Sequence, residues 1–191
     1  MKKLGITGGI GSGKSIVSEI FRLKGIPVYN ADSESKKLLI TNDELKKKLI
    51  NLLGEKIYFA DGSLNKKEMA QMIFSNASLL CEVNHIIHPV VGLDFLNWCN
   101  NQSSEIVATE SALLFESGLY KRIDTSIMVY APIDIRIERA VSRDKSSREQ
   151  IEARIKNQMD DEEKRVLSHH VIINDGQSPI LPQIENLLKS L

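Results

Sequence analysis

The chain has 191 residues, a length typical of one compact domain, and its 25 basic and 25 acidic side chains give a net charge of zero. This balance gives no support for a surface that binds nucleic acid. Two cysteines are too few for a disulfide-dependent secreted fold, and no stretch approaches the roughly 18 consecutive apolar residues of a membrane helix. We therefore expect a cytoplasmic protein with two buried thiols and no membrane or nucleic-acid partner.

Five short apolar runs predict strands, and several lack polar alternation, as do strands buried on both faces of a parallel sheet. They are residues 3–7, 26–29, 105–109, 126–130 and 171–173. Helical stretches separate them, so the pattern predicts an α/β fold. Three helix starts are predicted from capping pairs. The pairs are Thr41 with Glu44, Asn65 with Glu68, and Ser147 with Gln150.

The second and third strands are separated by roughly 75 residues, whereas a crossover needs only about a dozen. We therefore expect residues 31–104 to form a helical insertion in a core of residues 1–30, 105–132 and 166–191. A second helical excursion, residues 133–165, is charged and has no strand pattern. We expect this excursion to be a lid.

Residues 8–15 read GGIGSGKS and fit the phosphate-loop pattern GxxxxGK[ST], between an apolar strand and a helix. Its glycines let backbone N–H groups form an anion-binding concavity at a helix N-terminus. Lys14 can reach the β- and γ-phosphates of ATP, and Ser15 can supply a hydroxyl to Mg²⁺. The residues expected to bind ATP here are Gly11, Ser12, Gly13, Lys14, Ser15 and Ile16. The motif predicts a nucleoside triphosphate and does not identify the phosphate acceptor.

Two acids follow predicted strands at the sheet edge where ligands of open α/β folds bind. Asp32 could accept a proton from an attacking hydroxyl, or it could cap the next helix, and spacing alone does not separate these readings. Glu110 could help to hold Mg²⁺, through water, or it could be a carboxylate of a surface loop. Leu113, Leu114 and Phe115 could wall an acceptor pocket or belong to the core.

Basic side chains gather in the expected lid: Arg136, Arg139, Arg143, Lys145 and Arg148. The first three follow helical spacing and share a face. Arginine suits phosphate oxygens, so we favour phosphate binding for the cluster over a solvated face with internal ion pairs. The acidic stretch 160–163 is expected to be exposed surface. Asn174 begins a turn and could also face an adenine.

The four histidines offer no convincing zinc site. His88 and Pro89 are expected to separate two helical stretches. His88 could donate to a phosphate or satisfy a helix end.

The ordered set of motifs resembles the dephospho-CoA kinase family over nearly the whole chain. The segments that carry the resemblance are residues 5–15, NAD at 30–32, HPVV at 88–91, ALLFE at 112–116 and VIINDG at 171–176, together with Arg139, Arg143, Asp144, Arg154 and Gln158. The phosphate loop alone would be shared with many kinases, whereas the full set is far more specific.

The resemblance implies a P-loop core of five parallel strands, a helical CoA-binding domain and a lid. The implied reaction uses ATP and Mg²⁺ to phosphorylate the ribose 3′-hydroxyl of dephospho-CoA, the last step of CoA synthesis. It implies catalytic roles for Asp32, as the base, Lys14 and Arg143, and adds Arg139 and Asn174 to the ATP site. The implied substrate-binding residues are Thr7, Asp32, His88, Leu113, Phe115 and Arg154.

Some positions depart from the family pattern: Asn30, Ile16, Glu110, Ala112 and the pair His169 and His170. None removes Lys14, Ser15 or Asp32, so we expect activity to be retained. Two other readings stay open: a P-loop kinase with a nucleoside or nucleotide acceptor, and a nucleotide-binding switch without a small-molecule acceptor. The sequence favours a monomer or weak homo-oligomer.

Overall fold

The computed structural model describes residues 1–74 and 76–191, with no account of the Phe74 side chain, and the chain divides into two compact units. The first unit comprises Met1–Asn30 and Cys99–Leu191, and the second comprises Ala31–Trp98.

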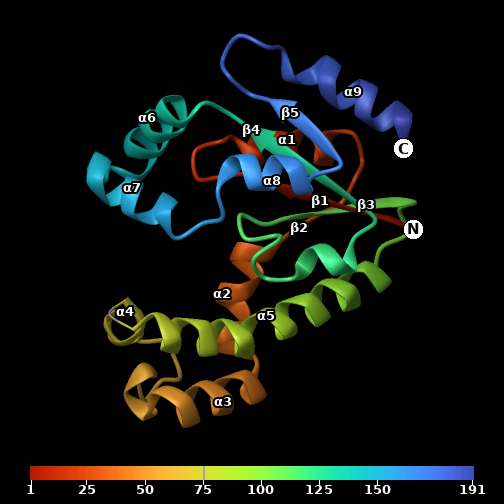
Figure 1. Cartoon of the computed structure of the whole chain (residues 1–191). Coiled ribbons are helices and arrows are strands. Elements are labelled where there is room, and N and C mark those ends of the chain that lie inside the picture. The colour runs from red at the N-terminus through yellow and green to blue at the C-terminus, as the bar shows by residue number, and fades with distance from the viewer. Residues whose placement is uncertain (75) are drawn as a thin grey trace. The chain divides into compact units, whose positions relative to one another are not determined.

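The first unit contains a sheet of five parallel strands in the order β2-β3-β1-β4-β5, visible in Figure 1. The strands are β1 (Lys2–Thr7), β2 (Val28–Asn30), β3 (Ile106–Glu110), β4 (Thr125–Tyr130) and β5 (His170–Ile173). All five predicted strands and the α/β fold class are therefore confirmed, with ends shifted by one or two residues. The central strand β1 lies between β3 and β4, so its carboxyl end sits in the middle of the sheet edge.

Helices pack on the sheet of the first unit. Those in contact with the strands are α1 (Lys14–Leu23), α8 (Asp161–Leu167) and α9 (Ile180–Ser190). The unit also contains α6 (Ile133–Asp144) and α7 (Arg148–Lys156), which pack against each other, and the 3-10 helix η2 (Leu119–Arg122). Leu4 and Ile6 of β1 share a buried cluster with Phe21 of α1 and Ile184 of α9. Because strand side chains alternate, Gly5 faces the other way, where Leu114 packs close to it. The sheet is therefore covered on both faces, as an all-parallel sheet requires.

The second unit is helical. It contains α2 (Ala31–Thr41), α3 (Asp43–Leu53), the 3-10 helix η1 (Glu55–Ile57), α4 (Lys66–Phe74) and most of α5 (Ala77–Asn100), whose last two residues belong to the first unit. Leu45, Leu49 and Leu53 recur every fourth residue and are buried, so α3 packs through one face. The only strand-like feature described in this unit is an isolated bridge between Tyr58 and Leu64.

Two predicted helix starts are confirmed and one is wrong. Ser147 forms a full capping box with Gln150, and the Asn65 side chain accepts a hydrogen bond from the backbone N–H of Glu68. The cap of α3 is Asn42, which accepts from the N–H of Leu45 at 2.9 Å. Thr41 instead ends α2 and donates to the carbonyl of Lys37. Asn outcompetes its neighbour because its side chain reaches the free N–H of the first turn.

The expected break at His88 and Pro89 is also wrong, because α5 continues through Pro89. A proline inside a helix removes one backbone donor, here the partner of the His85 carbonyl. Buried residues recur every fourth position on both sides of it, from Val83 to Cys99, and packing of this stripe holds the helix together. The expectation of two buried thiols holds for Cys99, whereas Cys81 is exposed; both cysteines are free.

Helix α5 is, among the described residues, the one helix long and apolar enough to cross a membrane by length and composition. One such helix is weak evidence for a membrane span, because a packed helix of a globular domain can pass the same test. The stripe of buried residues shows that one apolar face of α5 is packed inside the protein.

Candidate functional site

The phosphate loop joins β1 to α1, and its glycines leave no room for a side chain. Gly11 and Gly13 have φ of 79° and 94°, a region that L side chains rarely adopt. A Cβ on Gly11 would overlap with the backbone carbonyl of Arg136, and one on Gly13 would overlap with the Asn174 amide. Gly13 also occupies the N-cap position of α1, so the glycines turn the chain directly into a helix N-terminus.

Lys14, the first residue of α1, directs its ammonium group back over the loop. Its Nζ donates to the carbonyls of Gly8 at 2.8 Å and Gly9 at 3.1 Å. Both carbonyls belong to the loop itself, so the positive charge lies within the concavity formed by residues 8–13. A cation placed beside backbone N–H groups and a helix N-terminus favours a polyphosphate.

Beside Lys14, three polar side chains meet at the carboxyl ends of β2 and β3. Glu110 Oε1 accepts from the Ser15 hydroxyl and Glu110 Oε2 accepts from the Asn30 amide, each at 3.3 Å. The parallel register places Asn30 directly opposite Glu110. Glu110 is 6% exposed, so the alternative reading of a surface-loop carboxylate is wrong. Hydroxyl and carboxylate oxygens on adjacent residues are hard donors that fit Mg²⁺.

Asn174 joins the turn after β5 to the phosphate loop. Its Nδ2 donates to the carbonyl of Ser12 at 2.7 Å, and its own carbonyl accepts from Arg139 Nη1 at 2.9 Å. Ile16, on α1, is 53% exposed and approaches the same glycine as Asn174. The sequence placed Ile16 at the ATP site with the phosphate loop, and the resemblance added Arg139 and Asn174. The structure brings Arg139 and Asn174 together against the loop, with Ile16 exposed beside them.

Arg136 of α6 also holds the phosphate loop in place, a role that the sequence did not suggest. Its side chain is 2% exposed, its Nε donates to the Ile10 carbonyl at 2.9 Å, and its guanidinium forms an ion pair with Asp161. The N–H of Ile10 donates to Gln158 Oε1 at 3.1 Å. The expectation that residues 160–163 are exposed surface is therefore wrong for Asp161, which is drawn inward by the buried arginine.

A second buried cation, Lys164, joins α8 to the segment after β3. It is fully buried, donates to the Ala112 carbonyl at 3.0 Å and pairs with Glu116 at 2.9 Å. Glu116 also accepts from the N–H of Met159. Two contacts of one carboxylate thus hold the start of α8 against the ALLFE segment. Lys164 has no described contact with the phosphate loop.

Arg143 and Arg154 share one carboxylate at the far end of α6 and α7. Asp144 accepts two hydrogen bonds from Arg143, at 2.7 and 3.2 Å, and one from Arg154 at 2.6 Å. The hydrogen bonds from Arg143 and Arg154 hold the pKa of Asp144 well below its usual range, and Asp144 in turn raises the pKa of Arg143. The two arginine side chains are 60% and 49% exposed, so they keep surface available for a ligand.

The apolar candidates divide between core and surface. Leu114 is fully buried, and Phe115 is buried with its ring 5.7 Å from that of Tyr120, so both belong to the core, while Leu113 is partly exposed. Thr7 is fully buried and its hydroxyl has no hydrogen-bond partner among the described residues. The roles of Thr7 and Phe115 in substrate binding stay predictions.

Asp32 and His88 lie in the second unit, on α2 and α5. Asp32 is the second residue of α2 and lies within its first turn, so the two readings of Asp32, as a base and as a helix cap, both stay open. An acid in the first turn is still favoured by the helix dipole. The roles of both residues in catalysis and binding stay predictions. Within residues 1–74 and 76–191, no group of three His, Cys, Asp or Glu side chains could hold a metal.

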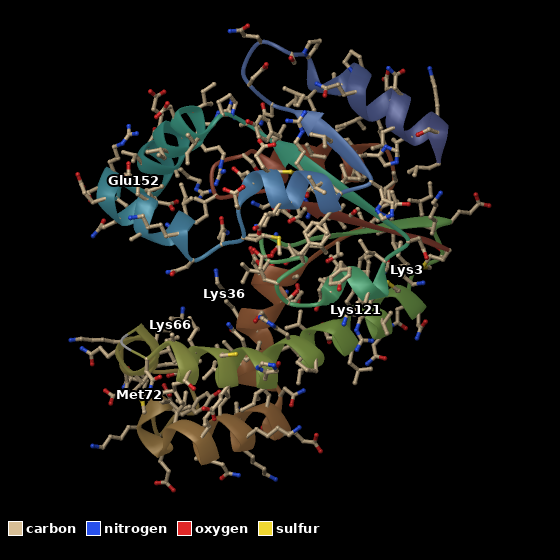
Figure 2. All side chains as sticks on the ribbon, in the orientation of Figure 1. Lys3, Lys36, Lys66, Met72, Lys121 and Glu152 are labelled. Atoms are coloured by element: carbon tan, nitrogen blue, oxygen red, sulfur yellow. The ribbon has the colours of Figure 1, made fainter. Side chains whose placement is uncertain are left out.

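A cavity of about 300 Å³ lies between α6 and α7, outside the phosphate loop. Its apolar wall is formed by Ile133, Ile137 and Ile155. Arg148 and Glu152, which is labelled in Figure 2, stand at its edge and form an ion pair at 2.8 Å. The charges at the rim already neutralise each other, so this cavity does not extend the phosphate-binding site.

The five-stranded parallel sheet, the phosphate loop after β1 and the acid at the end of β3 define a kinase of the P-loop class. The profile of the dephospho-CoA kinase family matches residues 3–179. A dephospho-CoA kinase of Bacteroides fragilis is 47% identical over 190 residues, covering 99% of this chain and 92% of that protein. The chain belongs to the dephospho-CoA kinase family.

Solved structures agree with this assignment. A Thermus thermophilus protein superposes with a TM-score of 0.82 at 31% identity, covering 99% of this chain and 95% of that one. Dephospho-CoA kinase from Campylobacter jejuni superposes with a TM-score of 0.67 at 26% identity, covering 100% and 96%. The P-loop fold predicted by the resemblance is confirmed.

Proposed function

We propose that this protein transfers the γ-phosphoryl group of ATP, bound with Mg²⁺, to the ribose 3′-hydroxyl of dephospho-CoA, giving CoA and ADP. The observation that carries the proposal is the cluster of Lys14, Ser15 and Glu110 on a phosphate loop, within a chain that matches one kinase family along almost its whole length.

In this proposal the phosphate loop and Lys14 hold the β- and γ-phosphates, while Ser15 and Glu110 hold Mg²⁺, with water between Glu110 and the ion. Mg²⁺ would neutralise charge on the phosphate oxygens. Asn30 donates to Glu110 and so fixes the rotamer of its carboxylate. Gly11, Ser12, Gly13, Ile16, Arg139 and Asn174 complete the ATP site.

Asp32 is the proposed general base, which takes the proton of the attacking 3′-hydroxyl. Its support is the family resemblance of the NAD segment, since Asp32 keeps the acid that Asn30 lacks. His88 and Arg154 are the proposed contacts with the negatively charged parts of dephospho-CoA, with Leu113 on the apolar wall.

We propose that residues 31–104 bind the CoA portion and that residues 133–165 act as a lid bearing Arg143. Within the lid, Arg136 is buried, and so is Lys164 of α8. These anchors restrict any closure to the segment between them, which carries Arg143 and Arg154. Closure of such a segment would exclude water and bring arginines to the transferring group. We further propose a cytoplasmic monomer or weak homo-oligomer.

ADP release from ATP and Mg²⁺, measured with and without dephospho-CoA, tests the proposal. AMP, adenosine and shikimate serve as rival acceptors. We expect release that depends on dephospho-CoA, with CoA as the product. Release with a rival acceptor instead would keep the kinase and discard the acceptor. Silence with every acceptor, despite ATP binding, would favour a nucleotide-dependent switch.

A further inference from the structure

Arg136 is a buried charge that the proposed reaction does not use. It lies on α6, is 2% exposed, and has two polar partners from different parts of the first unit. One is the Ile10 carbonyl in the phosphate loop and the other is the Asp161 carboxylate at the start of α8. Burying an arginine lowers the stability of the fold unless its N–H donors are satisfied. The presence of a buried arginine here therefore points to a role beyond stability.

The Ile10 carbonyl belongs to the peptide plane that also carries the Gly11 N–H. In a trans peptide these two groups point in opposite directions. The hydrogen bond from Arg136 Nε therefore turns the Gly11 N–H away from the arginine. Gly11 itself lies against the Arg136 backbone and has a φ of 79°, so the same residue limits this glycine sterically as well.

The preceding peptide is fixed in the same manner. The Ile10 N–H donates to Gln158 Oε1, and on the opposite side of that plane the Gly9 carbonyl accepts from Lys14 Nζ at 3.1 Å. Both peptides that flank Ile10 thus have a set orientation. Without these bonds a glycine-rich loop could rotate its peptides freely, because glycine populates several backbone regions.

We propose that Arg136, held by Asp161, is a positioning residue that fixes the Ile10–Gly11 peptide so that the Gly11 N–H is presented to the phosphates of ATP. The inference rests on the proposed function for its ligand. It assigns Arg136 no contact with the nucleotide and separates it from Arg139 and Arg143, with which it shares a helix. Its effect reaches the phosphates through the loop backbone.

The test measures calorimetric affinities for ATP with Mg²⁺ and for tripolyphosphate, in Arg136→Met, Arg136→Lys and Asp161→Asn. We expect Arg136→Met to weaken both ligands by a similar factor of about tenfold or more, because small misplacements of preorganised groups are costly. Arg136→Lys keeps the charge without the planar fork and should recover part of the affinity. The KM for dephospho-CoA should not change.

Lys164→Met is the matched control, since Lys164 is an equally buried cation of α8 with no described contact to the phosphate loop. We expect it to lower the melting temperature as Arg136→Met does, while both affinities stay at the wild-type value. The NMR signal of the Gly11 amide should shift on addition of tripolyphosphate in the wild type and in Lys164→Met, and shift less in Arg136→Met.

Wild-type affinity in folded Arg136→Met, or an equal loss in Lys164→Met, would overturn the inference. If Arg136→Met does not fold, Asp161→Asn decides, with an expected loss of about threefold and no loss as the overturning result. Binding requires no acceptor, so a failure of the dephospho-CoA assay leaves this test standing. A wild type that binds neither ligand would overturn both proposals.

Discussion

The phosphate loop and the far end of the α6–α7 pair both present positive charge, but they hold it in opposite ways. Lys14 lies over a backbone fixed by glycines, by Arg136 and by Asn174, all of them tied to the loop by hydrogen bonds or close contact. Arg143 and Arg154 are half exposed and share the carboxylate of Asp144. The phosphate loop is therefore organised before a ligand binds. Arg143 and Arg154, in contrast, must exchange the carboxylate of Asp144 for a phosphate.

Removing the positive charge of Lys14 from the phosphate loop should have the largest effect on activity. We expect Lys14→Ala to lower kcat by about 10³-fold or more and to weaken ATP binding, because this ammonium group neutralises the phosphates. Steady-state kinetics with dephospho-CoA and calorimetry with ATP would measure the two effects. Lys47→Ala, on the exposed side of α3, is the control. Normal turnover in Lys14→Ala would remove Lys14 from the site.

The next prediction concerns Asp32, the proposed base, which belongs to neither of these two regions. We expect Asp32→Asn to lower kcat by about 10²- to 10³-fold, the usual contribution of a general base, and to leave ATP affinity nearly intact. Asp43→Asn is a matched control, since Asp43 is likewise an acid in the first turn of a helix of the second unit. A normal kcat in Asp32→Asn would show that the base assignment is wrong.

Arg143→Ala should produce a smaller effect, confined to the reaction step. We expect kcat to fall about tenfold or more while KM for ATP changes less, as for a contact made mainly in the transition state. Arg148→Ala is the control, because Arg148 is an exposed arginine already paired with Glu152 and Asp134. An unchanged kcat in Arg143→Ala would reduce Arg143 to a surface residue of the lid.

Asp144→Asn should have the smallest effect, and a pH-dependent one. Because Arg143 and Arg154 lower the pKa of the folded Asp144, its ion pairs stabilise the fold above the unfolded aspartate pKa of about 4. This contribution fades as the pH falls from there toward the lowered pKa. We expect a loss of less than about 1 kcal/mol at neutral pH, since exposed pairs are screened. Denaturant unfolding of both proteins from pH 7 down to about pH 2, which covers the plateau and the start of this loss, would measure it. A difference that grows as the pH falls would contradict the assignment.

The sequence predicted those parts of the molecule whose signal is local. The strands, the phosphate loop and the Ser147 cap each depend on residues within one short segment. The continuity of α5 through Pro89 could not be predicted in this way, because it depends on burial along the whole helix.

The position of Arg136 was missed for a related reason. Its partners, Ile10 and Asp161, are 126 and 25 residues away, so helical spacing placed it with Arg139 and Arg143 as one cluster. Only the fold separates a buried arginine from an exposed one on the same helix. The available signal was Asp161, within the acidic stretch 160–163 and near Gln158, which helical spacing could not connect to the loop.

The strand order also sets the sequence of events in folding. The first strand, β1, pairs with β3, where Lys2 is opposite Ile106, so its partner emerges from the ribosome only after the whole second unit has been made. Pairings this far apart in the chain carry a high loop-closure cost and slow folding. We expect residues 31–98 to acquire their helices first, while the β1 segment waits, exposed and apolar, for a partner. This interval is when the chain is most open to aggregation or to a chaperone.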